Sequence, residues 1–402
     1  MKLSLVRMAG ALLLAGSASA LGVACAETDD PADPASAPDG SSLPAPDGAA
    51  PPDAADPDAS DAEAAAPPPC SPQGFCPKAL PGEAQTLRGV WGDGTGVAWT
   101  VGDQGDILRW DGTAWKVHAS GLGKLRAVWG AGPTDVWVGG EQGLFHGTGA
   151  TSSALVFAKL AAPGGAPMQI TSIWGLGAND VWVTGATLAT PPDSRVLHYT
   201  GASTDAGPTW AIDAVSARPL DFVAVWGSAA SGVWVAGSRP IQDNEFWNEM
   251  LVLRKPVGST TFGDVTLPQN PNEDPIAGKL SVFSGATTAT DGTMWIMGQS
   301  AGSRDARLRG TTTNGGLTFT WTRLPEEEGA ILRTFDVFST ANNEVYDIGQ
   351  FGRAKRFDGT EWKQAALTNT KLPIYKSLLA GWSAGKELWI VGNGAAIYQK
   401  KP

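Results

Sequence analysis

The stretch that decides the fold is Leu125–Gly140, which reads LRAVWGAGPTDVWVGG. An apolar segment ends at Trp129, small and polar residues follow, and a second apolar segment runs through Trp137 into Gly140. Period-two alternation bounded by turn residues predicts two antiparallel β-strands. Glycine at the end of the second strand indicates that backbone approaches backbone there, where no side chain fits.

The pattern recurs along the chain. An aromatic residue is followed three positions later by glycine in seven places: Trp99/Gly102, Trp137/Gly140, Trp182/Gly185, Trp234/Gly237, Trp295/Gly298, Tyr346/Gly349 and Trp389/Gly392. We expect each pair to follow another bulky aromatic by about eight residues, from the set Trp91, Trp129, Trp174, Trp226, Phe283, Phe338 and Trp382. One motif held at a period of about 40–55 residues while its spacers drift indicates a repeat architecture.

Third and fourth strands follow in most repeats, as in Asp106–Trp110 and Trp115–Val117. The chain is therefore predicted to be all-β, a β-propeller of seven four-stranded blades. A misassigned fifth or seventh repeat would change the count to six or eight. The seventh repeat supplies only three strands, and Phe75–Pro81 resembles the fourth strand of the second repeat, Phe157–Pro163. We expect residues 75–81 to complete the last blade and close the ring, which removes open sheet edges.

Residues 1–24 are predicted to be a signal peptide. Lys2 and Arg7 precede the apolar run Met8–Leu14, which is too short to span a membrane. Cleavage after Ala20 would give a secreted or periplasmic protein. Alternatively, Gly22–Cys25 resembles a bacterial lipobox, which implies lipidation of Cys25 and an outer-membrane or cell-surface lipoprotein. The composition of the next segment favours this second interpretation.

Residues 25–69 are predicted to form a disordered acidic tether. The segment is rich in Ala, Pro and Asp and has no Lys, Arg or aromatic residue, so it cannot bury enough apolar surface to order itself. It holds eleven of the 40 acidic residues, leaving 29 acidic against 29 basic residues elsewhere, so the net charge of −11 belongs to the tether. Residues 70–402 are then nearly neutral and lack the basic surface that nucleic acid requires.

The two remaining cysteines are Cys70 and Cys76. In an exported chain this close pair predicts a local disulfide. The three histidines are scattered at His118, His146 and His198, so no ligand set with metal-site spacing is present. We expect no metal and no cofactor.

One turn resembles a known motif. Thr312–Trp321 reads TTNGGLTFTW and resembles the Asp-box of BNR-type propellers, with Asn314 where that motif has Asp. Arg109–Trp115 and Arg356–Trp362 are looser relatives. The chain as a whole resembles bacterial Asp-box-like propeller lipoproteins of unknown function. The resemblance implies a structural turn between third and fourth strands. The arginine triad and the tyrosine nucleophile of the sialidases are not carried over.

Catalytic chemistry is not predicted. Motifs for a catalytic serine, a phosphate-binding loop or a metal-binding histidine pair do not occur. The carboxylates Glu326–Glu328 are typical of a solvated turn, and glycoside hydrolysis needs two carboxylates that face each other. A carbohydrate-acting hydrolase of the BNR class remains the alternative function.

Loop length indicates where a binding site would lie. Connections between second and third strands are long in repeats three to five, at Ala186–Ser194, Ser238–Glu249 and Gln299–Ala306, and function concentrates on such loops. The predicted contacts on the longest connection are Arg239, Asp243, Glu245, Phe246 and Trp247. Alternatively, Phe246 and Trp247 begin the third strand and pack inward. The sequence thus predicts a monomeric, envelope-anchored binding or scaffold module that recognises protein or glycan and contacts membrane only through its lipid.

Overall fold

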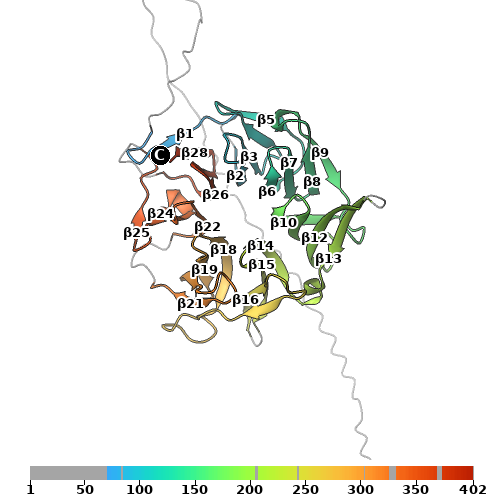
Figure 1. Cartoon of the computed structure of the whole chain (residues 1–402). Helices are drawn as coiled ribbons and strands as arrows, with labels where there is room; N and C mark the ends of the chain where they lie inside the picture. The colour runs from blue at the N-terminus through green and yellow to red at the C-terminus, as the bar shows by residue number, and fades with distance from the viewer. Residues whose placement is uncertain are drawn as a thin grey trace, which may run out of the picture. The chain divides into compact units, whose positions relative to one another are not determined.

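The computed structural model describes residues 70–82, 85–203, 207–241, 244–302, 304–325, 332–368 and 374–401. They form seven four-stranded antiparallel sheets arranged as the blades of a ring (Figure 1). The predicted signal peptide, the lipidation at Cys25 and the tether lie outside the described residues. The chain is a seven-bladed β-propeller, as its repeats predict.

The blades are numbered along the chain, and their strands are given from the inside of the ring outwards. Blade 1 contains β2 (Leu87–Gly92), β3 (Ala98–Gly102), β4 (Ile107–Trp110) and β5 (Trp115–Ala119). Blade 2 contains β6 (Leu125–Gly132), β7 (Asp135–Gly140), β8 (Gly143–Thr148) and β9 (Val156–Leu160). Blade 3 contains β10 (Met168–Gly177), β11 (Asp180–Thr187), β12 (Ser194–Ser203) and β13 (Gly207–Ile212). Blade 4 contains β14 (Asp221–Ser228), β15 (Gly232–Ile241), β16 (Asn244–Lys255) and β17 (Gly263–Val265).

The second half of the ring repeats this order. Blade 5 contains β18 (Leu280–Thr288), β19 (Met294–Ser300), β20 (Asp305–Thr311) and β21 (Thr320–Arg323). Blade 6 contains β22 (Thr334–Ser339), β23 (Val345–Gly349), β24 (Ala354–Phe357) and β25 (Trp362–Gln364). Blade 7 contains β26 (Leu378–Ala384), β27 (Glu387–Gly392), β28 (Ala395–Lys400) and, on its outside, β1 (Phe75–Pro77). Three single-turn 3₁₀ helices lie between strands: η1 (Ser152–Ala154), η2 (Ala214–Ala217) and η3 (Gln350–Gly352).

The glycine that ends a second strand lies against main chain, as predicted. A Cβ atom on Gly140 would lie 2.1 Å from the carbonyl oxygen of Lys124, at the start of the inner strand of the same blade. Five further blades show the same approach, at 2.0–2.1 Å, through Gly102, Gly185, Gly298, Gly349 and Gly392. At each of these places the inner strand carries a β-bulge. Glycine is therefore needed wherever the bulged strand presses on its neighbour.

Aromatic residues fill the space between blades. The ring of Trp91 in blade 1 covers Gly130 in blade 2, where a Cβ atom would lie 2.5 Å from the indole. Trp129 covers Gly175 in blade 3 in the same way. Each apolar core cluster accordingly combines residues of two neighbouring blades, such as Trp99 of blade 1 with Val136 of blade 2. Large flat side chains are suited to such sheet-to-sheet contacts because they bury a large apolar area.

The prediction for the inner aromatic of the fifth repeat is wrong. Trp91 pairs with Trp99 across β2 and β3, but the residue that pairs with Trp295 in blade 5 is Thr287. Phe283 instead pairs with Gly298 at the bulge, and its ring stacks on Trp226 of blade 4 at 5.2 Å. The aromatic side chain that blade 5 packs against blade 4 therefore comes from a different position of the inner strand. The spacing of twelve residues between Phe283 and Trp295, in place of about eight, already indicated this difference.

The N-terminal strand closes the ring. β1 pairs with β28 in antiparallel register, Phe75 opposite Gln399 and Pro77 opposite Ile397. The strand is shorter than the predicted 75–81, because after Lys78 donates to the carbonyl of Ala396 the chain leaves the edge and Leu80 packs against the core between blades 7 and 1. Cys70 and Cys76 form a disulfide in this structure, with sulfurs 2.06 Å apart.

Candidate functional site

The two faces of the ring carry different connections. Strands alternate in direction, so the connections from second to third strand and from each blade to the next lie on one face, here called the loop face. Of the predicted contacts, Arg239 and Trp247 belong to the loop-face hairpin of blade 4. Asp243 lies outside the described residues, and Glu245 and Phe246 are described only as main chain in β16.

The longest predicted loop is a β-hairpin. β15 continues to Ile241 and β16 begins at Asn244, with Arg239 paired to Glu249 and Pro240 paired to Asn248. Trp247 is a half-buried residue of β16 rather than the tip of a loop. Phe246 and Trp247 therefore belong to the third strand, which is the strand assignment of the alternative prediction. The arm Asn244–Met250 carries the aromatic residues Phe246 and Trp247, a residue type enriched in β-strands.

Arg239 forms an ion pair with Glu249 within the protein. Arg239 Nε donates to Glu249 Oε1 at 2.8 Å, and Lys279 Nζ lies 2.6 Å from Glu249 Oε2. Burial alone would raise the pKa of Glu249, but hydrogen bonds from Lys279 and Arg239 outweigh it and hold this pKa below its ordinary value. The three side chains tie the hairpin to the link that enters blade 5, so Arg239 is occupied by a neighbour in the fold.

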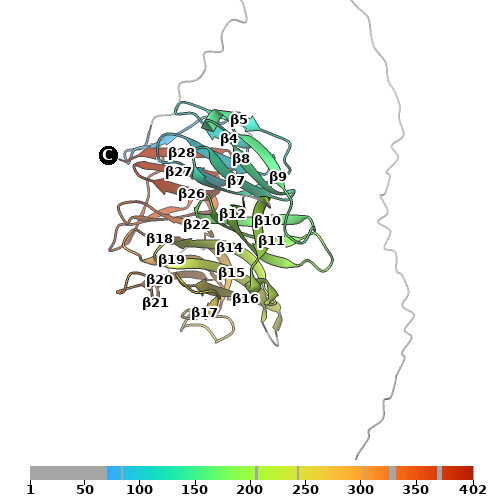
Figure 2. The same cartoon turned by 45° about the vertical axis from the view of Figure 1, so that its right-hand side comes forward.

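An apolar pocket opens on the loop face between blades 2 and 3. Its volume is about 170 Å³. The wall from blade 2 is the connection Gln142–Leu144, the end of β9 at Lys159 and Leu160, and the link Ala161–Pro167. The wall from blade 3 includes Ile170, Leu197 and Trp210. Figure 2 shows the two blades, labelled β7 to β9 and β10 to β12, side by side. The link is built from alanine, glycine and proline, so no long side chain of its own fills the space.

Further apolar surface borders this pocket. Ile212 is 42% exposed and Leu188 is 56% exposed. The side chain of Ile212 lies 3.6 Å from the Cβ position of Gly164, and the amide of Leu188 donates to the carbonyl of Pro167 at 3.0 Å. Both residues therefore flank the link that forms the pocket wall. Loop length did not reveal this pocket, because the pocket lies beside a short link of small residues and not beside a long loop. The sequence signal that could have revealed it is the run of small residues Ala161–Pro167.

A second cavity lies on the axis of the ring. Its volume is about 360 Å³, and inner strands of all seven blades line it. The ionisable residues among its lining are Arg88, Arg126 and Asp336. Arg88 is paired with Asp103 at 2.6 Å. Burial raises the pKa of Asp336 to about 7, against the effect of the two backbone amides that donate to its carboxylate.

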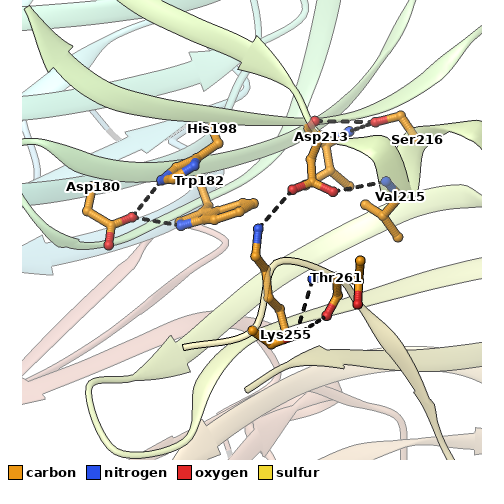
Figure 3. A network of polar contacts seen from close by, with 10 residues as sticks. Asp180, Trp182, His198, Asp213, Val215, Ser216, Lys255 and Thr261 are labelled. Carbon is orange, nitrogen blue, oxygen red and sulfur yellow. Dashed lines mark hydrogen bonds and ion pairs between the residues drawn. The ribbon is translucent and has the colours of Figure 1, made fainter. Parts of the chain in front are cut away.

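A polar stack supports the interface of blades 3 and 4 (Figure 3). His198 stacks on Trp182 with ring centroids 3.8 Å apart, and both side chains contact Asp180 Oδ1, at 2.9 and 2.8 Å. Lys255 of β16 lies over the Trp182 ring at 4.9 Å, and its ammonium is 3.2 Å from Asp213. The histidine, the indole and the lysine thus have partners within the fold, and the cluster connects neighbouring blades.

The contact of the acid with the third strand recurs in other blades, and in blade 2 the ring of His146 again stacks on Trp137. Each has an acidic residue two positions before the second-strand aromatic, and that acid contacts the third-strand residue opposite the aromatic. The three further sets are Asp135–Trp137–His146, Glu344–Tyr346–Arg356 and Glu387–Trp389–Tyr398. The spacing of acid and aromatic is visible in the sequence, whereas the third-strand partner becomes visible only with strand register. This recurrence indicates a structural role for His146 and His198.

The turn that resembles an Asp-box is internally bonded. Asn314 Oδ1 accepts from the amide of Thr318 at 2.9 Å, and Thr312 Oγ1 accepts from the amide of Gly316 at 2.9 Å. Arg254 of blade 4 donates to the carbonyl of Leu317 at 2.8 Å and packs between Trp234 and Phe319. The turn therefore connects blades 4 and 5 and has a structural role.

Two further findings concern the described part of the chain alone. In it, no three or more His, Cys, Asp or Glu side chains gather closely enough to hold a metal ion. Nor does any helix there have the length and apolar character needed to cross a membrane.

No family model and no curated protein matches the chain, but solved structures do. A catalytically inactive virginiamycin B lyase from Staphylococcus aureus, solved with quinupristin, is 13% identical, with TM-score 0.58, over 82% of this chain and 99% of its own. YCF48 from Cyanidioschyzon merolae is 14% identical, with TM-score 0.57, over 82% of this chain and 99% of its own. PorZ, a surface component of the type-IX secretion system of Porphyromonas gingivalis, is 14% identical, with TM-score 0.54, over 80% of this chain and 47% of its own. At such low identity the likeness shows the β-propeller fold alone.

Proposed function

We propose that this protein is an exported, non-enzymatic binding module that docks a partner protein on its loop face. The observation that carries the proposal is the apolar pocket between blades 2 and 3. An off-axis pocket lined by Leu144, Leu197 and Trp210 can take one apolar side chain of a partner, and such buried anchors dominate the affinity of protein interfaces. The exposed Leu188 and Ile212 would extend the contact around it.

The chemistry of the pocket favours protein over glycan. Aliphatic side chains and the small residues of the link form most of its lining, and Trp210 contributes the aromatic surface. A sugar would need several hydrogen-bonding groups placed around it, whereas an apolar side chain needs only an apolar surface that excludes water. Protein binding also has a precedent in the fold, since YCF48 has been solved bound to a D1 peptide.

The alternative function is a carbohydrate-acting hydrolase. Glycoside hydrolysis needs two carboxyl groups on either side of the scissile bond. Asp336 is the one carboxylate among the described residues that line the axial cavity. Glu326–Glu328 lie outside the described residues. The arrangement therefore favours binding, although virginiamycin B lyase shows that this fold also supports an enzyme.

Photo-crosslinking tests the pocket. A photoreactive amino acid at Ala161, which lines the rim, is compared in native envelope extract with the same group at Ala341, which is exposed on the opposite face. We expect a partner captured from Ala161 alone, and we expect Ala162→Trp, which fills the pocket, to weaken binding of that purified partner by about tenfold or more. Ala341→Trp is the matched control. Equal capture from both positions, or unchanged affinity of the pocket-filled variant, would refute the proposal.

Residues of the blade 4 hairpin remain a proposed second contact on the loop face. Among them Trp247 is the half-buried aromatic side chain that the structure describes. Trp247→Ala should weaken binding of the same partner if the interface spans blades 2 to 4, and leave it unchanged if the pocket acts alone. Titration of the purified partner into the wild-type protein and the Trp247→Ala variant distinguishes the wider interface from the pocket acting alone.

The anchor is proposed to be a lipid on Cys25, with residues 26–69 as the tether. Mass spectrometry of the N-terminal peptide from the native envelope tests this. A mature chain that begins at a lipid-modified Cys25 supports the anchor. A chain that begins at Leu21 without lipid shows that the protein is secreted or periplasmic.

A further inference from the structure

One position of the inner strands forms a ring around the axial cavity. It is the first residue after each β-bulge, opposite the residue that precedes the second-strand glycine. Six blades have a small residue at this position: Gly89, Ala127, Ser172, Ala224, Gly285 and Ala380. Blade 6 has Asp336. The six small residues show that the fold does not require a carboxylate at this place.

The side chain of Asp336 lies in the cavity wall between blades 5 and 7. Its Oδ2 accepts from the amide of Gly381 in blade 7 at 2.8 Å, and its Oδ1 accepts from the amide of Val337 at 2.8 Å. On the other side, a Cβ atom on Gly285 would lie 2.7 Å from Oδ1, so glycine leaves room for the carboxylate. Asp336 therefore both bridges two blades and lines the cavity.

Blade 3 provides an internal comparison. Ser172 holds the position equivalent to Asp336, and its hydroxyl accepts from the amide of Val225, the residue equivalent to Gly381, at 3.2 Å. A neutral hydroxyl is thus sufficient for the bridge between blades. A carboxylate at the same place adds a hydrogen bond from the amide of Val337 and a negative charge, and enclosing that charge in the protein has a free-energy cost.

That charge has no cation among the described residues. Arg88 and Arg126 line the same cavity, but Arg88 is paired with Asp103 at 2.6 Å and Arg126 lies 4.0 Å from Glu141. No ion pair joins Asp336 to any residue that the structure describes. Enclosed carboxylates without a partner cation concentrate at functional sites, where a ligand completes them.

We propose that the axial cavity is a second binding site, in which Asp336 receives an ammonium group carried on a slender aliphatic stem. The cavity, at about 360 Å³, is of the size typical of small-ligand sites. Small residues at the other six ring positions leave space for the stem beside the carboxylate. Two sources share this chemistry: a free primary amine, and a lysine side chain of a protein inserted along the axis. The site is separate from the pocket between blades 2 and 3, and does not depend on it.

Calorimetric titration of the purified protein at about pH 8 tests the site, since Asp336 is then mostly ionised. The probes are n-butylamine and a pentapeptide with one central lysine, an acetylated N-terminus and an amidated C-terminus. Each is compared with a neutral counterpart, n-butanol or the Nε-acetylated form of the same capped peptide. We expect at least one charged probe to bind and its neutral counterpart to fail. Binding of butylamine alone identifies a free amine as the ligand, and binding of the peptide identifies a protein side chain.

Asp336→Ser is the matched variant, because Ser172 shows that serine keeps the bridge between blades. We expect it to bind the charged probe about tenfold more weakly or worse, since a charge-assisted hydrogen bond is lost. Equal affinity of the variant and the wild-type protein would overturn the proposal, as would the failure of the wild-type protein to bind either charged probe.

A measurement on the wild-type protein covers the case in which the variant fails to fold. Both probes keep their charge between pH 5 and 8, and guanidinium groups do not titrate there. Protonation of Asp336 at about pH 5 should therefore weaken binding by roughly a hundredfold relative to saturating ionisation. A flat affinity across this range would contradict the role of Asp336.

Discussion

In six of the seven blades, the glycine that follows the second-strand aromatic by three residues is required by a steric contact with one carbonyl oxygen. Gly140 has an ordinary backbone conformation, but its Cβ position is 2.1 Å from the carbonyl oxygen of Lys124. Gly132 of the same blade has no atom within 4 Å of its Cβ position. The two glycines therefore separate the steric effect from the general effect of replacing glycine.

We predict that Gly140→Ala destabilises the protein by about 1–3 kcal/mol or more, since the bulged inner strand has to move. Gly132→Ala should change the free energy of unfolding by less than about 0.5 kcal/mol. Denaturant titration of both variants measures the difference. Similar midpoints for the two would show that the bulge yields easily.

Asp336 predicts a pH dependence of stability. Burial raises the pKa of Asp336 to about 7, whereas the unfolded chain has the ordinary value near 4. Between these values the folded protein keeps a proton that the unfolded chain has lost. Stability from this group is thus full below about pH 4 and is lost as pH rises to about 7, by up to roughly 1.4 kcal/mol per pH unit.

Asp336→Asn removes this titration. Its melting temperature relative to the wild-type protein should rise from about pH 4 to 7 and then level off. Calorimetry at several pH values gives the comparison. Parallel stability curves for the two proteins would show that the enclosure of the carboxylate has no free-energy cost.

At the scale of the element, β1 is a three-residue strand with one deeply buried side chain, that of Phe75. Phe75 is 1% exposed and contacts Tyr346 edge-on at a centroid distance of 6.2 Å. The adjoining disulfide limits the conformations of the entering chain. Together these features explain how so short a strand completes blade 7.

Phe75→Ala should lower the free energy of unfolding by about 3–5 kcal/mol, because it leaves a cavity between blades 6 and 7. Val156→Ala on β9 is the control, since Val156 is also a strand residue but is 72% exposed. Thermal unfolding followed by tryptophan fluorescence is the measurement. A loss in Phe75→Ala no larger than in Val156→Ala would mean that β1 does not contribute to the blade.

For the whole molecule, the pairing of β1 with β28 closes the ring and covers the outer edge of β28 in blade 7. Deleting residues 70–77 should leave β28 unpaired on its outer side and allow edge-to-edge association. We expect a lower melting temperature and oligomers in size-exclusion chromatography with light scattering. Deleting residues 26–69 instead, which leaves β1 in place, should not produce them. A monomeric, equally stable protein without residues 70–77 would show that three strands suffice for blade 7.

Sequence by itself determined the repeat, a count of about seven blades, the closing strand and the need for glycine where backbone approaches backbone. These are local matters, since strand alternation, turn residues and aromatic spacing act within one blade. Tertiary structure decided the rest. Arg239 is paired with Glu249, a hollow forms between two blades where the link has no long side chain, and Asp336 joins a ring of small residues, because each outcome depends on which segments, distant in the sequence, lie side by side.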